Sequence, residues 1–195
     1  MGARSVGDSP APVDIITGSD FVNQGAMDLP DMIRTLVPSF NVNTQPISDA
    51  ATLIRPANLR GLPPDNMLVL VIGKMRHRGA VISFLGSGIS DGAQGPDISA
   101  IPSIALKQVE VLRDGASAQY GSDAIAGIMN FVYRDNSEGT QLEIRTGEYK
   151  EGDGDAWRIA ANVGMPFTSA GFANLSIELQ DSKATSRSVQ RADAQ

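Results

Sequence analysis

The densest group of side chains able to do chemistry is Arg76-His77-Arg78, which follows an apolar run. Guanidinium groups bind anions through charge-assisted hydrogen bonds, so this cluster predicts contact with an anionic ligand. An ordinary exposed loop with a run of charge explains the same residues. His77 is the one histidine of the chain, and a single imidazole without neighbouring carboxylates or a second histidine makes no metal site.

Catalytic constellations are missing from the sequence. Cysteine is absent, which excludes a thiol nucleophile, disulfides and cysteine-ligated metals. No G-x-S-x-G elbow occurs, and the serine, histidine and aspartate residues follow no hydrolase order. The acidic stretch Glu151 to Asp155 faintly resembles a calcium loop but lacks the closing glutamate, so it is interpreted as a solvated hairpin loop. We therefore expect no enzyme, no metal site and no cofactor.

The length and the net charge of the chain limit the number of domains and the kinds of binding partner that it can have. The chain has 195 residues, enough for one domain with an appendage. It carries 16 basic and 22 acidic residues and a net charge of -6, which argues against a nucleic-acid surface. No run approaches the ~18 apolar residues of a membrane-spanning helix. The N-terminal residues lack a secretory signal pattern, so we expect that any signal of an exported protein has been removed.

The stretch Val109 to Val132, VEVLRDGASAQYGSDAIAGIMNFV, is the one around which we expect the fold to assemble. Two apolar runs flank Asp114-Gly115 and Tyr120-Gly121-Ser122, which predicts strand, turn, short helix, turn and strand. Its glycines indicate tight turns and close packing rather than phosphate binding, because the pattern of a phosphate loop is missing.

Upstream of that stretch, a mixed pattern of short strands and helices is expected after a mobile arm at residues 1–11. Met67 to Ile72 is a run of apolar residues, which predicts a strand covered on both faces at the centre of the sheet, followed by a hairpin turn at Gly73-Lys74. The other expected elements are a strand at Val13–Thr17, a helix start at Gly18, a helix capped by Asp28 with Pro30 in its first turn, a short strand at Phe40–Val42, an edge strand or bulge at Pro56, and a short helix over Ile98–Leu106.

After Arg134 the apolar residues alternate with polar ones. Three period-2 segments of about nine residues, centred near Ile144, Ala161 and Ile177, are long enough to cross a membrane as tilted strands. A soluble antiparallel meander fits the same pattern, and periodicity alone favours it. In either case three strands stop without closure, which leaves an edge and an uncovered apolar face.

These motifs together resemble the plug domain of TonB-dependent outer-membrane transporters. The resemblance rests on Leu59-Arg60-Gly61, on MLVLVIGK from Met67, on Ile101-Pro102 with Ile104, and above all on VEVLRDGASAQYGSDAIAGIMNFV. It implies an α+β plug over residues 12–135, with a small mixed β-sheet and short helices. Residues 136–195 would hold about three antiparallel strands of an incomplete transmembrane β-barrel, so the chain is expected to be a fragment.

The resemblance also implies a function and partners. The family imports scarce nutrients such as metal chelates, cobalamin or glycans, so the expected partners are TonB, the chain's own barrel, a small-molecule or oligosaccharide substrate, and the outer membrane. Two departures are visible in the sequence. Ile72 stands where the turn often carries Asn or Asp, and nothing before the Val13 strand fits the segment that pairs with TonB.

Site residues follow from the resemblance. Arg60 and Arg113 resemble plug arginines that pair with glutamates on the inner barrel wall, a lock between plug and barrel; solvated surface arginines are the alternative. The loops at Thr44–Ala51 and Lys74–Pro96 resemble the apical loops that contact substrate. The expected ligand-binding residues in them are Gln45, Ser48, Asp49, Arg76, His77, Arg78, Phe84 and Leu85.

Two other classes remain open from the sequence. The chain could be a soluble periplasmic binding or signalling module with plug-like architecture, which folding of the three strands back onto the sheet of a monomer would favour. A hydrolase fragment is disfavoured, because no nucleophile is paired with a base.

Overall fold

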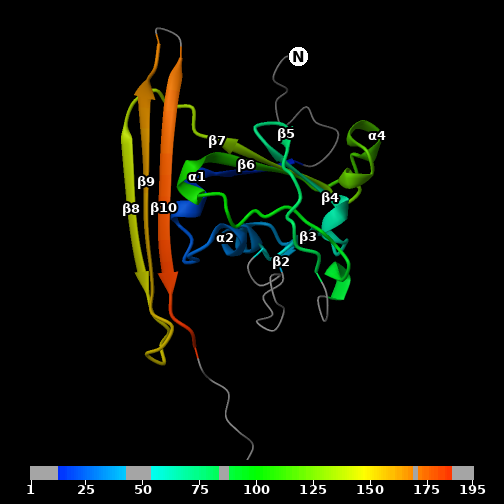
Figure 1. The fold of residues 1–195 in the computed structure, drawn as a ribbon, viewed down its shortest axis with the longest axis horizontal. Helices are drawn as coiled ribbons and strands as arrows, with labels where there is room; N and C mark the ends of the chain where they lie inside the picture. The colour runs from blue at the N-terminus through cyan, green and yellow to red at the C-terminus, as the bar shows by residue number, and fades with distance from the viewer. Residues whose placement is uncertain (1–12, 43–53, 84–87, 169–170, 186–195) are drawn as a thin grey trace, which may run out of the picture.

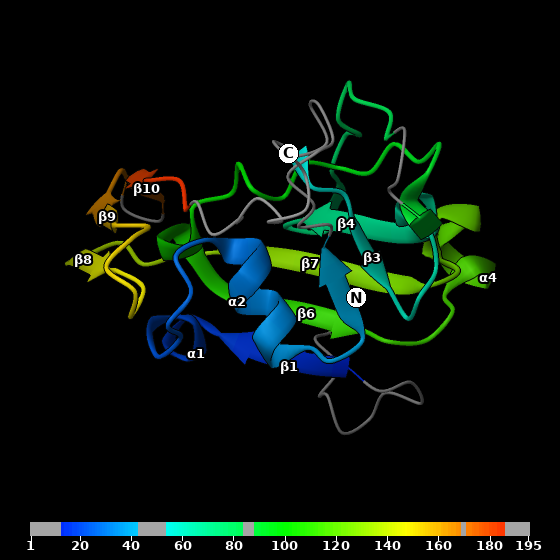
Figure 2. The same cartoon turned by 90° about the horizontal axis from the view of Figure 1, so that it is seen from below.

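The computed structural model describes residues 13–42, 54–83, 88–168 and 171–185. An α/β part with a mixed sheet lies beside a separate antiparallel sheet of three long strands (Figures 1 and 2). No helix in these ranges is long and apolar enough to cross a membrane.

The mixed sheet has the order β1-β6-β7-β4-β5 in the described part of the chain. β4 and β7 are parallel, and the other neighbouring strands are antiparallel. The strands are β1 (Val13–Thr17), β4 (Met67–Val71), β5 (Lys74–Met75), β6 (Leu106–Leu112) and β7 (Gly127–Tyr133).

The expected position of β4 at the centre of the sheet is wrong. β4 is indeed buried on both faces, but β7 is the central strand and β4 is followed only by the two-residue β5. The apolar run shows that β4 is buried, but not where it lies in the sheet. In an α/β fold a strand next to the edge strand can be covered on both faces. The sequence does not indicate that β7 is central, because the polar residue Asn130 interrupts its apolar run. In the structure the Asn130 side chain donates to Glu110 and accepts from the backbone N–H of Gly73.

The predicted turn after β4 is shifted by one residue. Ile72 and Gly73 form the turn, with φ values of 51° and 73°, and Lys74 already belongs to β5. Positive φ at both central residues is typical of the type I′ turn, whose twist matches antiparallel strands. Ile72 is a β-branched residue in the left-handed region, where such residues are rarely found.

Helices α1 (Gly18–Val22) and α2 (Leu29–Leu36) were both predicted. The Asp28 side chain caps α2 by accepting from the backbone N–H of Asp31 at 2.9 Å, as the sequence indicated. Met32 and Ile33 of α2 are fully buried in the main core. α2 lies on the same face of the mixed sheet as the two-stranded pair of β2 (Phe40–Val42) and β3 (Ala57–Leu59) (Figures 1 and 2).

The stretch from Val109 to Val132 folds as predicted. β6 leads into α4 (Ser117–Tyr120) and a 3-10 turn at Ser122–Ala124, and β7 follows. Gly127 is required where β7 begins, because a Cβ there would lie 2.2 Å from the carbonyl oxygen of Leu112. Gly127 therefore serves close packing, while Gly121, with a φ of 86°, serves the turn.

The expected helix over Ile98–Leu106 is wrong. A 3-10 turn at Ser103–Ala105 follows Pro102, and Leu106 already starts β6. Pro102 has no N–H to donate and disfavours helical dihedrals at Ile101, so the helix cannot run through it. The remaining 3-10 turns of the described chain are at Pro64–Asn66 and Gly88–Ser90.

The second sheet consists of the three alternating segments that the sequence predicted. β8 (Thr140–Gly147), β9 (Ala156–Pro166) and β10 (Phe172–Ser182) pair antiparallel in the order β10-β9-β8. Their outward positions carry exposed apolar side chains, and their inward positions face the α/β part. The exposed outward set is Leu142, Ile144, Trp157, Ile159, Met165, Leu175, Ile177 and Leu179.

Candidate functional site

Charged side chains form two rows across the inner face of the β8–β10 sheet. In one row Glu143, Ala160 and Glu178 are direct cross-strand partners. In the next row Arg145 lies opposite Arg158. Like charges directly opposite each other are unfavourable, so the two glutamates of the neighbouring row are needed to balance the two arginines. The small buried Ala160 separates the two carboxylates.

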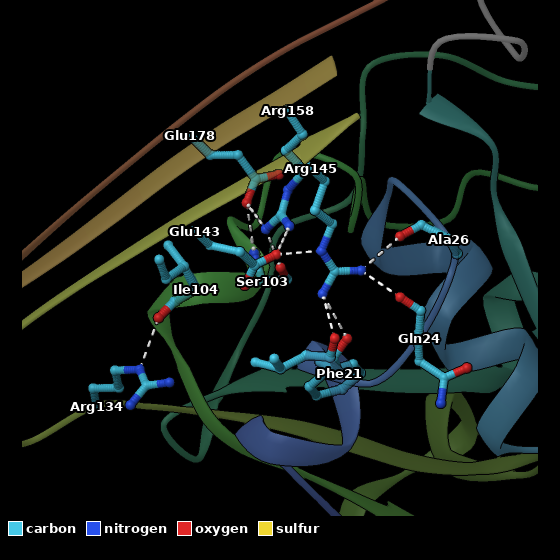
Figure 3. Close-up of polar contacts among 11 residues, drawn as sticks. Phe21, Gln24, Ala26, Ser103, Ile104, Arg134, Glu143, Arg145, Arg158 and Glu178 are labelled. Carbon is cyan, nitrogen blue, oxygen red and sulfur yellow. Dashed lines mark hydrogen bonds and ion pairs between the residues drawn. The ribbon is translucent and has the colours of Figure 1, made fainter. Parts of the chain in front are cut away.

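Arg158 is the most buried charge of the molecule's described part, with none of its surface exposed. Its guanidinium contacts Glu143 at 2.5 Å, Glu178 at 2.7 Å and the Ser103 hydroxyl at 2.5 Å (Figure 3). The Ser103 backbone N–H in turn donates to Glu178 at 3.1 Å. Arg158 and Glu178 therefore hold the turn that precedes β6 against the strands β9 and β10.

Arg145 reaches the α/β part at a different place. Its Nη2 donates to the carbonyl oxygens of Phe21 and Val22 at 3.0 Å each, and its Nη1 donates to those of Gln24 at 2.5 Å and Ala26 at 3.1 Å. Glu143 accepts from its Nε. Figure 3 shows the Arg145 side chain, which comes from β8, pointing toward the segment that joins α1 to α2. One guanidinium thus satisfies four carbonyl groups at and beyond the C-terminus of α1.

A third contact lies where the chain leaves the mixed sheet for β8. Asn174 donates to the side-chain oxygen of Asn136 at 2.8 Å, and Asn162 bonds Asn174 and, at 2.8 Å, Ser176. A Cβ at Gly164 would lie 2.4 Å from the carbonyl oxygen of Asn136, so the connecting segment passes directly over the β9 backbone. The inner face of the sheet is therefore matched to the segment that crosses it.

This arrangement joins two parts of the protein and has no reacting group. Its members are arginines, carboxylates and amides that satisfy one another, and no side chain is poised as a nucleophile. In the described ranges no group of three His, Asp or Glu residues comes together as metal ligands. Binding between the α/β part and the strands is the function this geometry can perform.

Arg60 and Arg113 take other partners within the described residues. Arg113 forms an ion pair with Asp14 of the edge strand β1 at 2.7 Å. The pair therefore lies within the plug, at the edge of the mixed sheet, and the Arg113 side chain is 40% exposed. Arg60 has a φ of 57° and donates its backbone N–H to Ser39, and its side chain forms no ion pair with any described residue. The glutamates of β8 and β10 pair with Arg145 and Arg158 instead. Pairing of Arg60 and Arg113 with other strands stays a prediction.

The structure describes only some of the residues predicted to bind a ligand. Arg78 pairs with Asp123 at 3.2 Å and Asp65 at 3.7 Å, which ties it to the two 3-10 turns beside β4 and β7. The Nε of Arg76 is buried without a hydrogen-bond partner among the described residues, while His77 is exposed. Gln45, Ser48, Asp49, Phe84 and Leu85 lie outside the described residues. A role of the whole set in binding stays a prediction.

Two carboxyl groups near α1 and α2 have shifted pKa values. The Thr17 hydroxyl and backbone N–H both donate to Asp20 at 2.7 Å and lower the pKa of its carboxyl. Burial and the nearby Asp28 raise the pKa of Asp31, against the opposing effect of Arg55. The segment held by Arg145 is therefore flanked by carboxylates in different environments.

Comparisons with known proteins identify the family of the α/β part. The family model for the TonB-dependent receptor plug domain matches residues 5–128. The chain belongs to this family of TonB-dependent receptor plug domains.

Similar proteins are receptors. The ferric enterobactin receptor PirA of Pseudomonas aeruginosa is 30% identical over 162 residues, which cover 81% of this chain and 21% of that protein. The ferrienterobactin receptor of Escherichia coli is 32% identical over 117 residues, 59% of this chain and 15% of that protein. This chain thus spans about a fifth of the relative PirA. The expectation of a receptor domain and not an enzyme is confirmed by the family.

Solved structures show the same arrangement. The crystal structure of the siderophore receptor PirA from Acinetobacter baumannii matches with a TM-score of 0.66 and 25% identity, over 90% of this chain and 25% of that chain. Since the match covers most of this chain, β8 to β10 correspond to the first barrel strands of such receptors. The predicted fold class, a plug followed by three barrel strands, is confirmed.

The contact residues Glu143, Arg145, Arg158 and Glu178 were not singled out from the sequence. All four stand at the inward positions of the alternating segments, where a soluble meander or a barrel both place polar residues. A signal was available, because these four residues are charges of both signs at the inward positions of three successive segments, where neighbouring strands allow them to pair. Their partners in residues 21–26 carry no sequence signal, since the four contacts of Arg145 there are to backbone carbonyl groups.

Proposed function

We propose that this chain is the gate and substrate-contact domain of a TonB-dependent receptor that imports a metal chelate of the siderophore class across the outer membrane. The observation that carries the proposal is the similarity to receptors named for ferric enterobactin and siderophores, together with the family match. Cobalamin and glycans, which the family resemblance also allows, are named for none of the relatives given above.

The outer membrane is supported by the outward face of β8 to β10. Leucine, isoleucine and tryptophan side chains there are between 41% and 65% exposed, as shown by Ile159 and Leu175. Such a face is costly in water and favourable in lipid, while the inward face carries the charged rows. β9 and β10 span Ala156–Pro166 and Phe172–Ser182, lengths that suit tilted membrane strands.

Gating follows from the contact between plug and barrel. Substrate bound at the loops shifts the plug between two arrangements only by its difference in affinity for them. TonB is proposed to act on the N-terminal side of β1, through a pairing segment that nothing before Val13 in this sequence fits. Arg76 and Arg78 are proposed to contribute positive charge toward an anionic chelate, and His77 to contact it together with the loop residues named from the sequence.

Direct binding to the complete receptor that carries this chain tests the substrate class. The purified receptor would be titrated with ferric enterobactin, a ferric hydroxamate chelate, cobalamin and an oligosaccharide, with binding followed calorimetrically. We expect a ferric chelate to bind at least about a hundredfold more tightly than cobalamin or the oligosaccharide, equal to about 2.7 kcal/mol. Preferential binding of cobalamin or the oligosaccharide would contradict the proposed substrate class.

A further inference from the structure

The first strand of the plug is weakly held. β1 is an edge strand, and within the described chain it is hydrogen-bonded to β6 alone. Ile16 is its one buried side chain, and Ile15 is 39% exposed. The ion pair of Asp14 with Arg113 is well exposed on both sides, and exposed pairs add little stability. Removing β1 therefore disturbs little of the core.

The segment that follows is held far more firmly. Phe21 is 2% exposed and belongs to the main core. α1 has only five residues, so its own hydrogen bonds cannot hold it, and its last carbonyl groups need external donors. Arg145 supplies them at Phe21, Val22, Gln24 and Ala26.

The donor comes from the barrel wall and is itself fixed. The Arg145 side chain is 14% exposed, and Glu143 holds its Nε while also contacting Arg158 at 2.5 Å. A planar guanidinium with five donors can serve four carbonyl groups and a carboxylate at once, which an ammonium group cannot. Arg145 therefore holds residues 21–26 from the barrel side, in addition to the packing of Phe21 in the plug's core.

We propose that Arg145 divides the plug into a releasable edge, Val13–Asp20, and a part held on the barrel from Phe21 onward. The proposal rests on the proposed function, because the load on β1 would come from TonB. Pulled from its N-terminal side, β1 separates from β6 together with the start of α1, and separation stops at the carbonyl groups that Arg145 holds. The path opened is then the space left by β1, with β4, β6 and β7 still in place.

Single-molecule pulling on the complete receptor in lipid, from a handle upstream of β1, tests the division. The wild type is expected to extend in two steps. The first frees residues 13–20, about 25–30 Å of extended chain, and the gain in extension is this length minus the distance that the residues already span in the fold. In Arg145→Ala the first step should free the chain up to Asp28 at the start of α2, about 50–55 Å of extended chain. Arg145→Lys keeps the charge and should give two steps with the second at lower force.

Matched controls separate this role from general damage. Lys183→Ala removes an exposed pair with Asp155 on the barrel, and the Lys183 ammonium forms no ion pair with a described plug residue, so the two steps should equal those of the wild type. Hydrogen exchange gives a second readout. The amides of Asn23 and Gln24, bonded to Ser19 and Phe21, should exchange about 10- to 100-fold faster in Arg145→Ala, while those of β7 keep their rates.

Two results would overturn the division: identical step lengths in Arg145→Ala and the wild type, or equal acceleration of β7 and of Asn23. Neither measurement needs a chelate. A receptor that binds no ferric chelate but shows the two steps would contradict the proposed substrate and leave the division standing, so the two failures are distinguishable.

Discussion

Arg158 shows how single residues on the β8–β10 sheet resolve a conflict created by its register. The antiparallel pairing places Arg158 directly opposite Arg145, and burial of a guanidinium costs free energy unless carboxylates accompany it. Glu143 and Glu178 provide them, one from each neighbouring strand, and Ser103 adds a neutral acceptor from the plug. The same side chain therefore balances the barrel wall and binds the plug to it.

Replacing Arg158 should loosen that contact. Arg158→Ala in the complete receptor takes the guanidinium away from Glu178 and leaves Glu143 with Arg145 alone, which is expected to cost about 3–5 kcal/mol. The urea dependence of exchange at the Ser103 amide, which donates to Glu178, measures the loss. Lys183→Ala is the control and should leave that amide unchanged. Equal protection of Ser103 in Arg158→Ala and the wild type would show that this ion cluster does not hold the plug.

Asp20 should make the start of α1 sensitive to acid. Its pKa is lowered by the Thr17 hydroxyl and backbone N–H, so the ionised form is favoured in the folded protein. This stabilisation is present above the ordinary pKa of 3.8 and is lost as the pH falls through the lower folded-state value.

Exchange of the Thr17 amide, corrected for its intrinsic rate, checks the effect of Asp20. In Asp20→Asn the amide should lose protection above pH 3.8, and the difference from the wild type should shrink below it. Glu138→Gln, at an exposed position, serves as the control. A difference that grows on acidification would have the wrong sign for a lowered pKa.

At the scale of elements, the β4–β5 hairpin has a side chain that its turn disfavours. Ile72 has a φ of 51° and is 60% exposed, so burial does not compensate for its left-handed backbone. Asn adopts this conformation readily and is typical of the type I′ turn.

Ile72→Asn is accordingly expected to stabilise the receptor by about 1 kcal/mol. The midpoint of thermal unfolding of the complete receptor would show the gain. Met75→Asn is the matched control, because Met75 is 63% exposed in the same hairpin and has an ordinary φ. A gain of the same size in Met75→Asn would attribute the effect to surface polarity and not to the turn.

Elements were predictable where local chemistry decides them. Asp28 and Pro30 marked the start of α2, and the glycines around α4 marked the path from β6 to β7. Strand order was not predictable from β4, since its apolar residues report burial and not which strands lie on either side. The helix expected around Pro102 failed because the apolar residues there serve a 3-10 turn and a strand.

At the scale of the whole molecule, the plug and the three strands meet through contacts that join residues far apart in sequence. Arg158 and Ser103 are 55 positions apart, and Arg145 and Phe21 are 124 apart. Periodicity predicts which residues of a strand share a face, but not which surface that face meets. The family resemblance was needed to expect a plug against a barrel wall, and the structure was needed to find the residues that hold it.

The proposed function of this chain is to gate TonB-dependent import of a ferric chelate. Uptake of radiolabelled iron as ferric enterobactin, by cells whose only receptor for it is the complete protein carrying this chain, tests the claim most directly. We predict uptake in cells with TonB, none in cells without it, and retained binding at the surface of both. Uptake that persists without TonB, or no uptake of any ferric chelate in cells with it, would contradict the account.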